Sequence, residues 1–174
     1  MKYFVKFVVV TLFVLICTDT FAEQKIVVLD LKVVLNNSKA GKGAQDFLKK
    51  SFTENTKKFA DMEKELKKEE TDLLSKKTVL SKEEYTKKSD SLRKKVIDYQ
   101  SQRRSSLDKI ATQRTKYRAT LIKETDKILK AYIKENNITL VIEKKGTLGG
   151  NPANDITPII VEKLNKEFPA LNLK

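Results

Sequence analysis

Two short apolar runs flank a long charged segment in the middle of the chain. Both runs are continuous rather than alternating, and both are rich in β-branched side chains, which is typical of buried strands. We therefore predict two buried strands, the second over residues 138–142. Their apolar residues are Ile26, Val27, Val28 and Leu29 in the first strand and Ile138, Leu140, Val141 and Ile142 in the second.

A short helix is predicted beside each strand. Asp30 follows the first strand and can cap a helical turn that carries the apolar residues 33–35. Beyond the second strand, Asp155 or Thr157 is placed to cap a last helix that continues to about Glu167.

The segment between the strands predicts uninterrupted helix. Residues 44–145 contain no glycine, proline, histidine or cysteine, so nothing in the backbone stops a helix from propagating. Apolar residues recur there at intervals of seven, the spacing of a coiled-coil seam. They are Phe52, Phe59, Leu66, Leu73 and Leu80. The partner position is half polar and holds Leu48, Asn55, Met62, Glu69 and Lys76.

This helical segment is expected to reverse once. Ser81 and Glu84 have the spacing of a capping box, which marks a new helix start. A reversal gives helices of about 40 and about 55 residues and brings the two strands together, whereas one continuous helix would hold them more than roughly 100 Å apart. We therefore predict an α+β fold, in which a long antiparallel helical hairpin projects from a small β-rich oligomerisation body. The arm spans residues 44–136 with its tip near 75–82, and the body holds residues 23–43 and 137–174.

The body is expected to self-associate. Two strands and short helices make a small core for the 152 residues from 23 to 174, and lean domains commonly gain stability by oligomerisation. The half-polar seam of the arm buries little apolar area. The distal hairpin should therefore bend and splay more easily than a tight coiled coil.

The first residues predict an export signal. Lys2 and Lys6 precede an apolar core of eleven residues (7–17), and small residues follow at Thr20 and Ala22, the pattern of a cleaved signal peptide. The apolar core is shorter than the roughly 20 residues that span a bilayer, although a retained membrane anchor is the alternative. Cleavage after Ala22 makes residues 1–22 a signal peptide and residues 23–174 a single cysteine-free domain.

Charge gives the arm its candidate function. Residues 76–118 hold 14 basic and 5 acidic side chains, and such a segment attracts polyanions. In an exported protein, anionic lipid head groups or acidic proteins fit better than nucleic acid, and a merely solubilising surface is the alternative. We predict that this surface and scattered aromatic residues hold an unfolded chain by many weak contacts, although the aromatic residues could instead pack the seam. The candidate contact residues are Phe52, Phe59, Lys76, Lys77, Lys87, Lys88, Arg93, Lys94, Lys95, Tyr99, Arg103, Arg104 and Tyr117.

Catalytic and metal-binding patterns are weak. The chain has no histidine and only Cys17, and adjacent carboxylates such as Glu69 and Glu70 diverge by about 100° on a helix. Residues 38–44 resemble a phosphate loop but lack its first glycine and its final hydroxyl residue. We expect no enzyme, metal or cofactor, and we expect Gly41 and Gly43 to permit a turn into the long helix.

Several segments resemble the Skp/OmpH-like family of periplasmic chaperones. The opening over residues 26–45, the tip sequence Leu80–Glu84 and the closing segments 138–142 and 155–165 are similar to the patterns of that family. The resemblance implies a homotrimer with a small β-barrel body and three helical arms, which enclose unfolded outer-membrane proteins in the periplasm without ATP. Family members usually form another strand where this chain has residues 146–152, so that strand is in question here.

The resulting hypothesis is an ATP-independent periplasmic holdase for unfolded outer-membrane proteins. Its partners would be those clients, further copies of itself and anionic membrane lipids, and not nucleic acid. Two alternatives stay open at this point. One is a structural coiled-coil adaptor or spacer in the cell envelope, and the other is a histone-like nucleic-acid binder.

Overall fold

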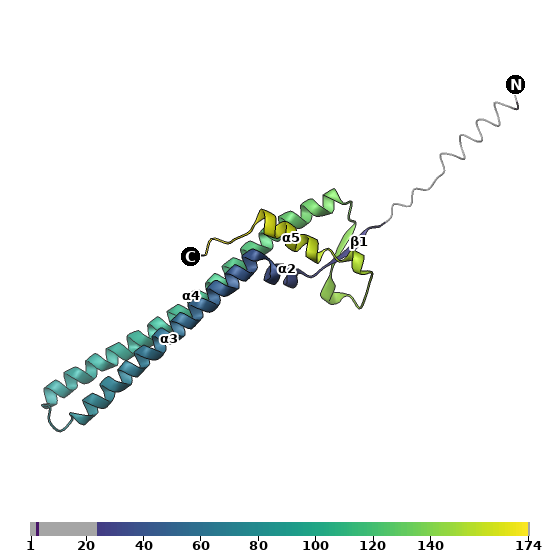
Figure 1. The fold of residues 1–174 in the computed structure, drawn as a ribbon. Coiled ribbons are helices and arrows are strands. Elements are labelled where there is room, and N and C mark those ends of the chain that lie inside the picture. Colours follow the sequence, from purple (N-terminus) through teal and green to yellow (C-terminus); the bar gives the residue numbers. More distant parts are fainter. Residues whose placement is uncertain (1–2, 4–23, 174) are drawn as a thin grey trace.

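The computed structural model describes residue 3 and residues 24–173. Two long helices lie side by side and project from a small body that holds the strands and the shorter helices (Figure 1). In chain order the elements are β1 (Ile26–Leu29), α2 (Leu31–Asn37), α3 (Lys39–Ser75), α4 (Lys82–Glu135), β2 (Leu140–Glu143), η1 (Lys144–Gly146), η2 (Pro152–Asn154) and α5 (Thr157–Glu167). The predicted signal peptide lies outside the described residues. Within those residues, no helix has the length and apolar character needed to cross a membrane.

The predicted hairpin and α+β class are confirmed. α3 has 37 residues and α4 has 54, which correspond to lengths of about 55 Å and 80 Å. The capping box is present at the start of α4, where the Ser81 hydroxyl accepts a hydrogen bond from the Glu84 amide at 3.2 Å. The Glu84 carboxylate accepts one from the Ser81 amide at 3.1 Å. This cap begins α4 after the reversal, and α3 and α4 run antiparallel within the arm.

The expectation of a turn at the two early glycines is wrong. α3 already begins at Lys39, after its N-cap Ser38, so Gly41 and Gly43 lie inside the helix. A Cβ atom added at Gly41 would lie 1.7 Å from the carbonyl oxygen of Leu35, whereas one added at Gly43 would meet nothing within 4 Å. The lack of a side chain at Gly41 therefore allows α3 to lie close to the end of α2.

The strands pair in parallel. β1 and β2 lie in register from Ile26 opposite Leu140 to Leu29 opposite Glu143. Parallel neighbours need a long crossover connection, and here the whole arm forms it. Residues 144–154 contain two short 3₁₀ turns in place of a regular third strand. Beyond them, the Ile156 amide donates to the Val28 carbonyl at 3.0 Å, on β1.

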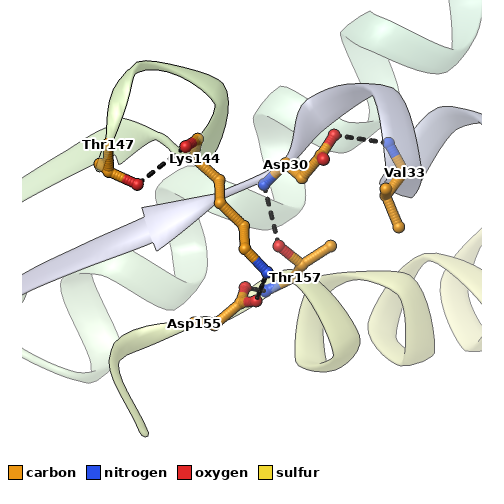
Figure 2. Close-up of polar contacts among 6 residues, drawn as sticks. All are labelled: Asp30, Val33, Lys144, Thr147, Asp155 and Thr157. Carbon is orange, nitrogen blue, oxygen red and sulfur yellow. Dashed lines mark hydrogen bonds and ion pairs between the residues drawn. The ribbon is translucent and has the colours of Figure 1, made fainter. Parts of the chain in front are cut away.

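Polar contacts join β1 to the start of α5 (Figure 2). Asp30 caps α2 as predicted, because its carboxylate accepts from the Val33 amide at 2.8 Å. The Asp30 amide donates to the Thr157 hydroxyl at 2.9 Å. Asp155 accepts from Lys144 at 2.6 Å and from the Thr157 amide at 2.9 Å. Partial burial opposes ionisation of Asp155, but these hydrogen bonds outweigh it and hold its pKa below the usual range.

The predicted cap of α5 is wrong. Ile156 occupies the N-cap position, and its side chain makes no capping hydrogen bond. The side chains of Asp155 and Thr157, which were expected there, are engaged instead with Lys144 and with the Asp30 amide.

The core of the body forms around the buried sides of β1, α2, α4 and α5. It consists of Val27, Leu29, Val34, Ile128, Ile138, Ile156, Ile160 and Leu164. The prediction of two buried strands is only partly right. Ile26, Leu140 and Ile142 remain 40%, 51% and 36% exposed, while Val28 and Val141 are half-buried. The single chain therefore leaves apolar side chains of both strands in contact with solvent.

Candidate functional site: the helical arm

Apolar residues between the two helices hold the arm together unevenly. Phe59 and Leu92 are buried, with 6% and 9% exposure, whereas Leu66 and Leu73 are only half-buried. The Phe59 ring packs edge-on against Tyr99 at 6.0 Å between centroids. Such a pair adds packing specificity beyond its buried area.

The four candidate aromatic residues do not share one environment. Phe59 and Tyr117 are buried in the seam, at 6% and 4% exposure, whereas Phe52 is 52% exposed. Tyr99 is half-buried, and its hydroxyl lies 3.4 Å from the Glu63 carboxylate. Phe59 and Tyr117 therefore act mainly in packing, and Phe52 is the aromatic side chain of the four that is most open to a partner.

The candidate basic residues all lie on the surface. Lys76, Lys77, Lys87, Lys88, Arg93, Lys94, Lys95, Arg103 and Arg104 are exposed. Among the described residues, two of them form ion pairs: Arg93 with Asp90 at 3.0 Å and Lys95 with Glu69 at 2.7 Å. The other seven have no carboxylate within ion-pair distance, so their charge is available to a partner.

The net basic charge of the arm lies mainly on one of its two helices. α3 carries 9 basic and 8 acidic residues, whereas α4 carries 16 basic and 8 acidic residues. The arm is therefore two-sided in charge, with a nearly neutral helix beside a strongly basic one. An acidic partner will be drawn to the α4 side.

Arginine shows a segregation that the sequence analysis missed. All five arginines of the chain lie on α4 within residues 93–118, although the chain has 31 lysines. Exposed apolar side chains stand among them, with Ile97 at 57% and Leu107 at 44% exposure. Arginine binds carboxylates in a bidentate manner and stacks on planar groups, which lysine cannot do. Separate counts of arginine and lysine would have revealed this surface.

Polar seam positions are accommodated at the edge of the helix pair. Glu69 occupies a heptad position, and it accepts hydrogen bonds from Lys95 across the arm at 2.7 and 2.8 Å. Glu63 pairs with Lys67 at 2.8 Å on its own helix. That hydrogen bond and the Lys67 charge hold the pKa of Glu63 below its usual value, while Glu63 raises the pKa of Lys67. These groups are exposed to solvent, which weakens their pairing.

Two open grooves follow the seam. The distal groove has a volume of about 500 Å³ and a mainly apolar floor that includes Leu66, Leu73 and Tyr85. The proximal groove has a volume of about 530 Å³, and its lining includes Phe52 and Arg118. Apolar surface beside basic side chains thus recurs along the arm. Among the described residues, no group of three His, Cys, Asp or Glu side chains is placed to hold a metal ion.

Comparisons with known proteins find a similar structure and a matching family. A crystal structure of a proposed outer membrane chaperone (OmpH-like) from Caulobacter crescentus CB15 has the same fold, with a TM-score of 0.80 and 17% sequence identity; the match covers 87% of this chain and 89% of that one. No curated protein matches the chain closely enough to count as a relative. The family model described as outer membrane protein (OmpH-like) matches residues 25–164. The resemblance read from the sequence is thereby confirmed, and the chain belongs to the OmpH-like outer membrane protein family.

Proposed function

We propose that this protein is an ATP-independent periplasmic holdase that binds unfolded outer-membrane proteins and prevents their aggregation in transit. The observation that carries the proposal is the surface of α4, which presents exposed basic residues without ion-pair partners together with exposed apolar side chains such as Ile97 and Leu107. Membership of the OmpH-like family and the fold shared with a proposed outer membrane chaperone support the same role.

Binding by this surface rests on many weak contacts. The basic residues attract an acidic unfolded chain over distances comparable to the Debye length, about 8 Å at physiological ionic strength. Exposed apolar residues such as Ile97, Leu107 and Phe52 then retain its apolar segments. Linked weak contacts add avidity while each one exchanges rapidly. A client can therefore be held and released without nucleotide hydrolysis.

We further infer that the body assembles as a homotrimer after signal-peptide cleavage. Ile26, Leu140 and Ile142 leave apolar area of the two-stranded sheet exposed in a single chain, and exposed apolar patches commonly mark interfaces. Closure of several such sheets around one axis would bury these side chains. It would also place the arms around a common space.

The test compares charge reversal on the two helices. In the α4 variant, Lys87, Lys88, Lys94 and Arg104 are changed to Glu; in the matched α3 control, Lys42, Lys49, Lys57 and Lys64 are changed to Glu. Affinity for an unfolded acidic β-barrel protein is measured by fluorescence anisotropy, and its solubility by light scattering. We expect about a tenfold loss for the α4 variant and a much smaller loss for the control.

Two results would contradict the proposal. Equal loss of affinity in both variants would show that net charge, and not the α4 surface, attracts the client. Failure of the protein with its natural sequence to keep the diluted client soluble would rule out the holdase activity itself.

A further inference from the structure

The C-terminal segment, residues 168–173, leaves the body and returns to the base of the arm. α5 ends at Glu167, because a residue that precedes proline, here Phe168 before Pro169, is disfavoured in helical conformation. Figure 1 shows this segment continuing from α5 in the direction of the arm. The side chain of Asn165 accepts a hydrogen bond from the Lys39 amide at 2.6 Å, which fixes the end of α5 to the start of α3.

Apolar residues of this segment pack on two clusters of the arm base. Leu171 and Leu173 contact the cluster formed by Ala44, Leu48, Ile110 and Tyr117. Phe168 and Leu171 contact the cluster formed by Leu35, Ala40 and Leu121. Leu171 thus joins both clusters. The small side chains Ala40 and Ala44 leave space at the seam, and the tail leucines cover it.

The mode of contact is that of an extended peptide on a helix pair. Residues 169–173 form no regular secondary structure; Leu171 and Leu173 are half-buried while Asn172 between them is exposed. From Leu171 to Leu173, side chains therefore alternate between the arm and solvent with the period of two that extended chains have. Within the described chain, residues 169–173 make no backbone–backbone hydrogen bond to the arm. No strand ladder therefore has to break when this segment leaves the arm.

We propose that residues 169–173 are an intramolecular ligand of the proximal arm. They occupy a docking groove formed by the two clusters above, which is not the open proximal groove, since no tail residue lines that one. This docking groove also accepts extended client segments with alternating apolar side chains. This pattern is the one found in strands of outer-membrane barrels, so the client class rests on the function proposed above. Because the tail is tethered, it competes at high effective concentration. A client segment must displace it, and the tail thereby lowers the apparent affinity of the resting protein. The family match ends at residue 164, before this segment.

The first experiment needs no client. A labelled peptide of residues 166–173 is titrated by fluorescence anisotropy onto residues 23–174 and onto a chain that ends at residue 167. We expect the shortened chain to bind the peptide at least about tenfold more tightly, because its groove is vacant. A peptide with L171D and L173D should not bind, and a peptide with N172D should bind as the natural one does. Failure of the natural peptide to bind the shortened chain would overturn the proposal.

A second variant guards against misfolding of the shortened chain. In full-length protein, L171D with L173D should release the tail and raise peptide affinity by a similar factor, while N172D is the matched control at an exposed position. Helix content is checked by circular dichroism. Equal peptide binding by the double variant and the control, with native helix content in both, would overturn the proposal.

The last measurement adds the client. An unfolded β-barrel protein should compete with the labelled peptide and bind the L171D/L173D variant more tightly than the N172D control. If the client binds all variants equally and does not compete with the peptide, the groove is not a client site and the proposal fails. If no variant binds the client, the holdase function fails, while the peptide titration still decides whether the tail occupies a groove.

Discussion

The two halves of the arm are built from the same heptad pattern and yet differ in what holds them together. The proximal half comprises residues 39–55 and 107–123, and the distal half comprises residues 56–75 and 82–106. Buried residues of the proximal half are Ala40, Gly41, Ala44, Leu48, Ile110, Tyr117 and Leu121, whereas those of the distal half are Phe59 and Leu92. Small side chains bring the helices close near the body, and the seam then opens toward the tip.

If the proposed function holds, this difference separates the half that supports the arm from the half that captures a client. Close packing near the body fixes the arm to it, because each Å² of buried apolar area stabilises the folded state by about 25 cal/mol. The distal half depends more on solvent-exposed contacts such as Glu69 with Lys95, which contribute at most about 1 kcal/mol each. A distal half with so little burial can splay at low energetic cost, as a surface that adapts to irregular chains requires.

The strongest test of the proximal packing is Gly41→Ala. The added Cβ would lie 1.7 Å from the Leu35 carbonyl oxygen, which is backbone and cannot move aside without shifting α2. We expect a loss of about 3 kcal/mol in the free energy of unfolding, measured by urea denaturation at fixed protein concentration.

Gly43→Ala is the matched control for that substitution. Its Cβ would meet nothing within 4 Å, and alanine is favoured over glycine inside a helix by about 1 kcal/mol. The control should therefore gain stability. A Gly41→Ala variant as stable as the natural protein would show that the close approach of α2 and α3 does not anchor the arm.

Much of this architecture could be predicted from local signals. The capping box at Ser81 and the absence of helix breakers in residues 44–145 were sufficient to place the hairpin and its tip. The close contact at Gly41 could not be predicted, because it depends on where the end of α2 lies. The path of residues 168–173 was missed for a similar reason: two alternating leucines signal an extended segment but not the surface that it covers. Likewise, the heptad repeat showed which residues face the seam and not how deeply Phe52 or Phe59 is buried.

The distal half is tested by Phe59→Ala. Phe59 is 6% exposed and packs on Tyr99, so its loss removes the largest buried side chain of that half. We expect a local loss of about 2 kcal/mol, below the usual cost of removing a buried phenylalanine because the open seam can collapse. Hydrogen exchange should rise about thirtyfold for amides of the distal half and stay unchanged in the proximal half.

Phe52→Ala is the control at another position of the same heptad series. Phe52 is 52% exposed, so its substitution should change stability by less than about 0.5 kcal/mol. Equal exchange in both halves after Phe59→Ala would mean that the arm unfolds as one unit, and the distinction between the halves would be lost.

The smallest expected effect is a loosening of the distal half by acid. The pKa of Glu63 lies below its usual value of 4.5 because of the hydrogen bond from Lys67, and that of Glu84 is lowered by hydrogen bonds from Ser81. A lowered folded-state pKa gives stability that is present above the usual value and is lost as pH falls through the folded value. The proximal seam is packed instead by apolar side chains such as Leu48 and Ile110. The distribution of distances between spin labels on cysteines introduced at Lys68 and Lys94 should therefore broaden as the pH falls below the usual value of 4.5. It should do so before the distribution between labels at Lys42 and Lys123. The double variant E63Q/E84Q should reduce this acid response, and simultaneous broadening of both label pairs would show that general charge repulsion, and not these two carboxylates, opens the arm.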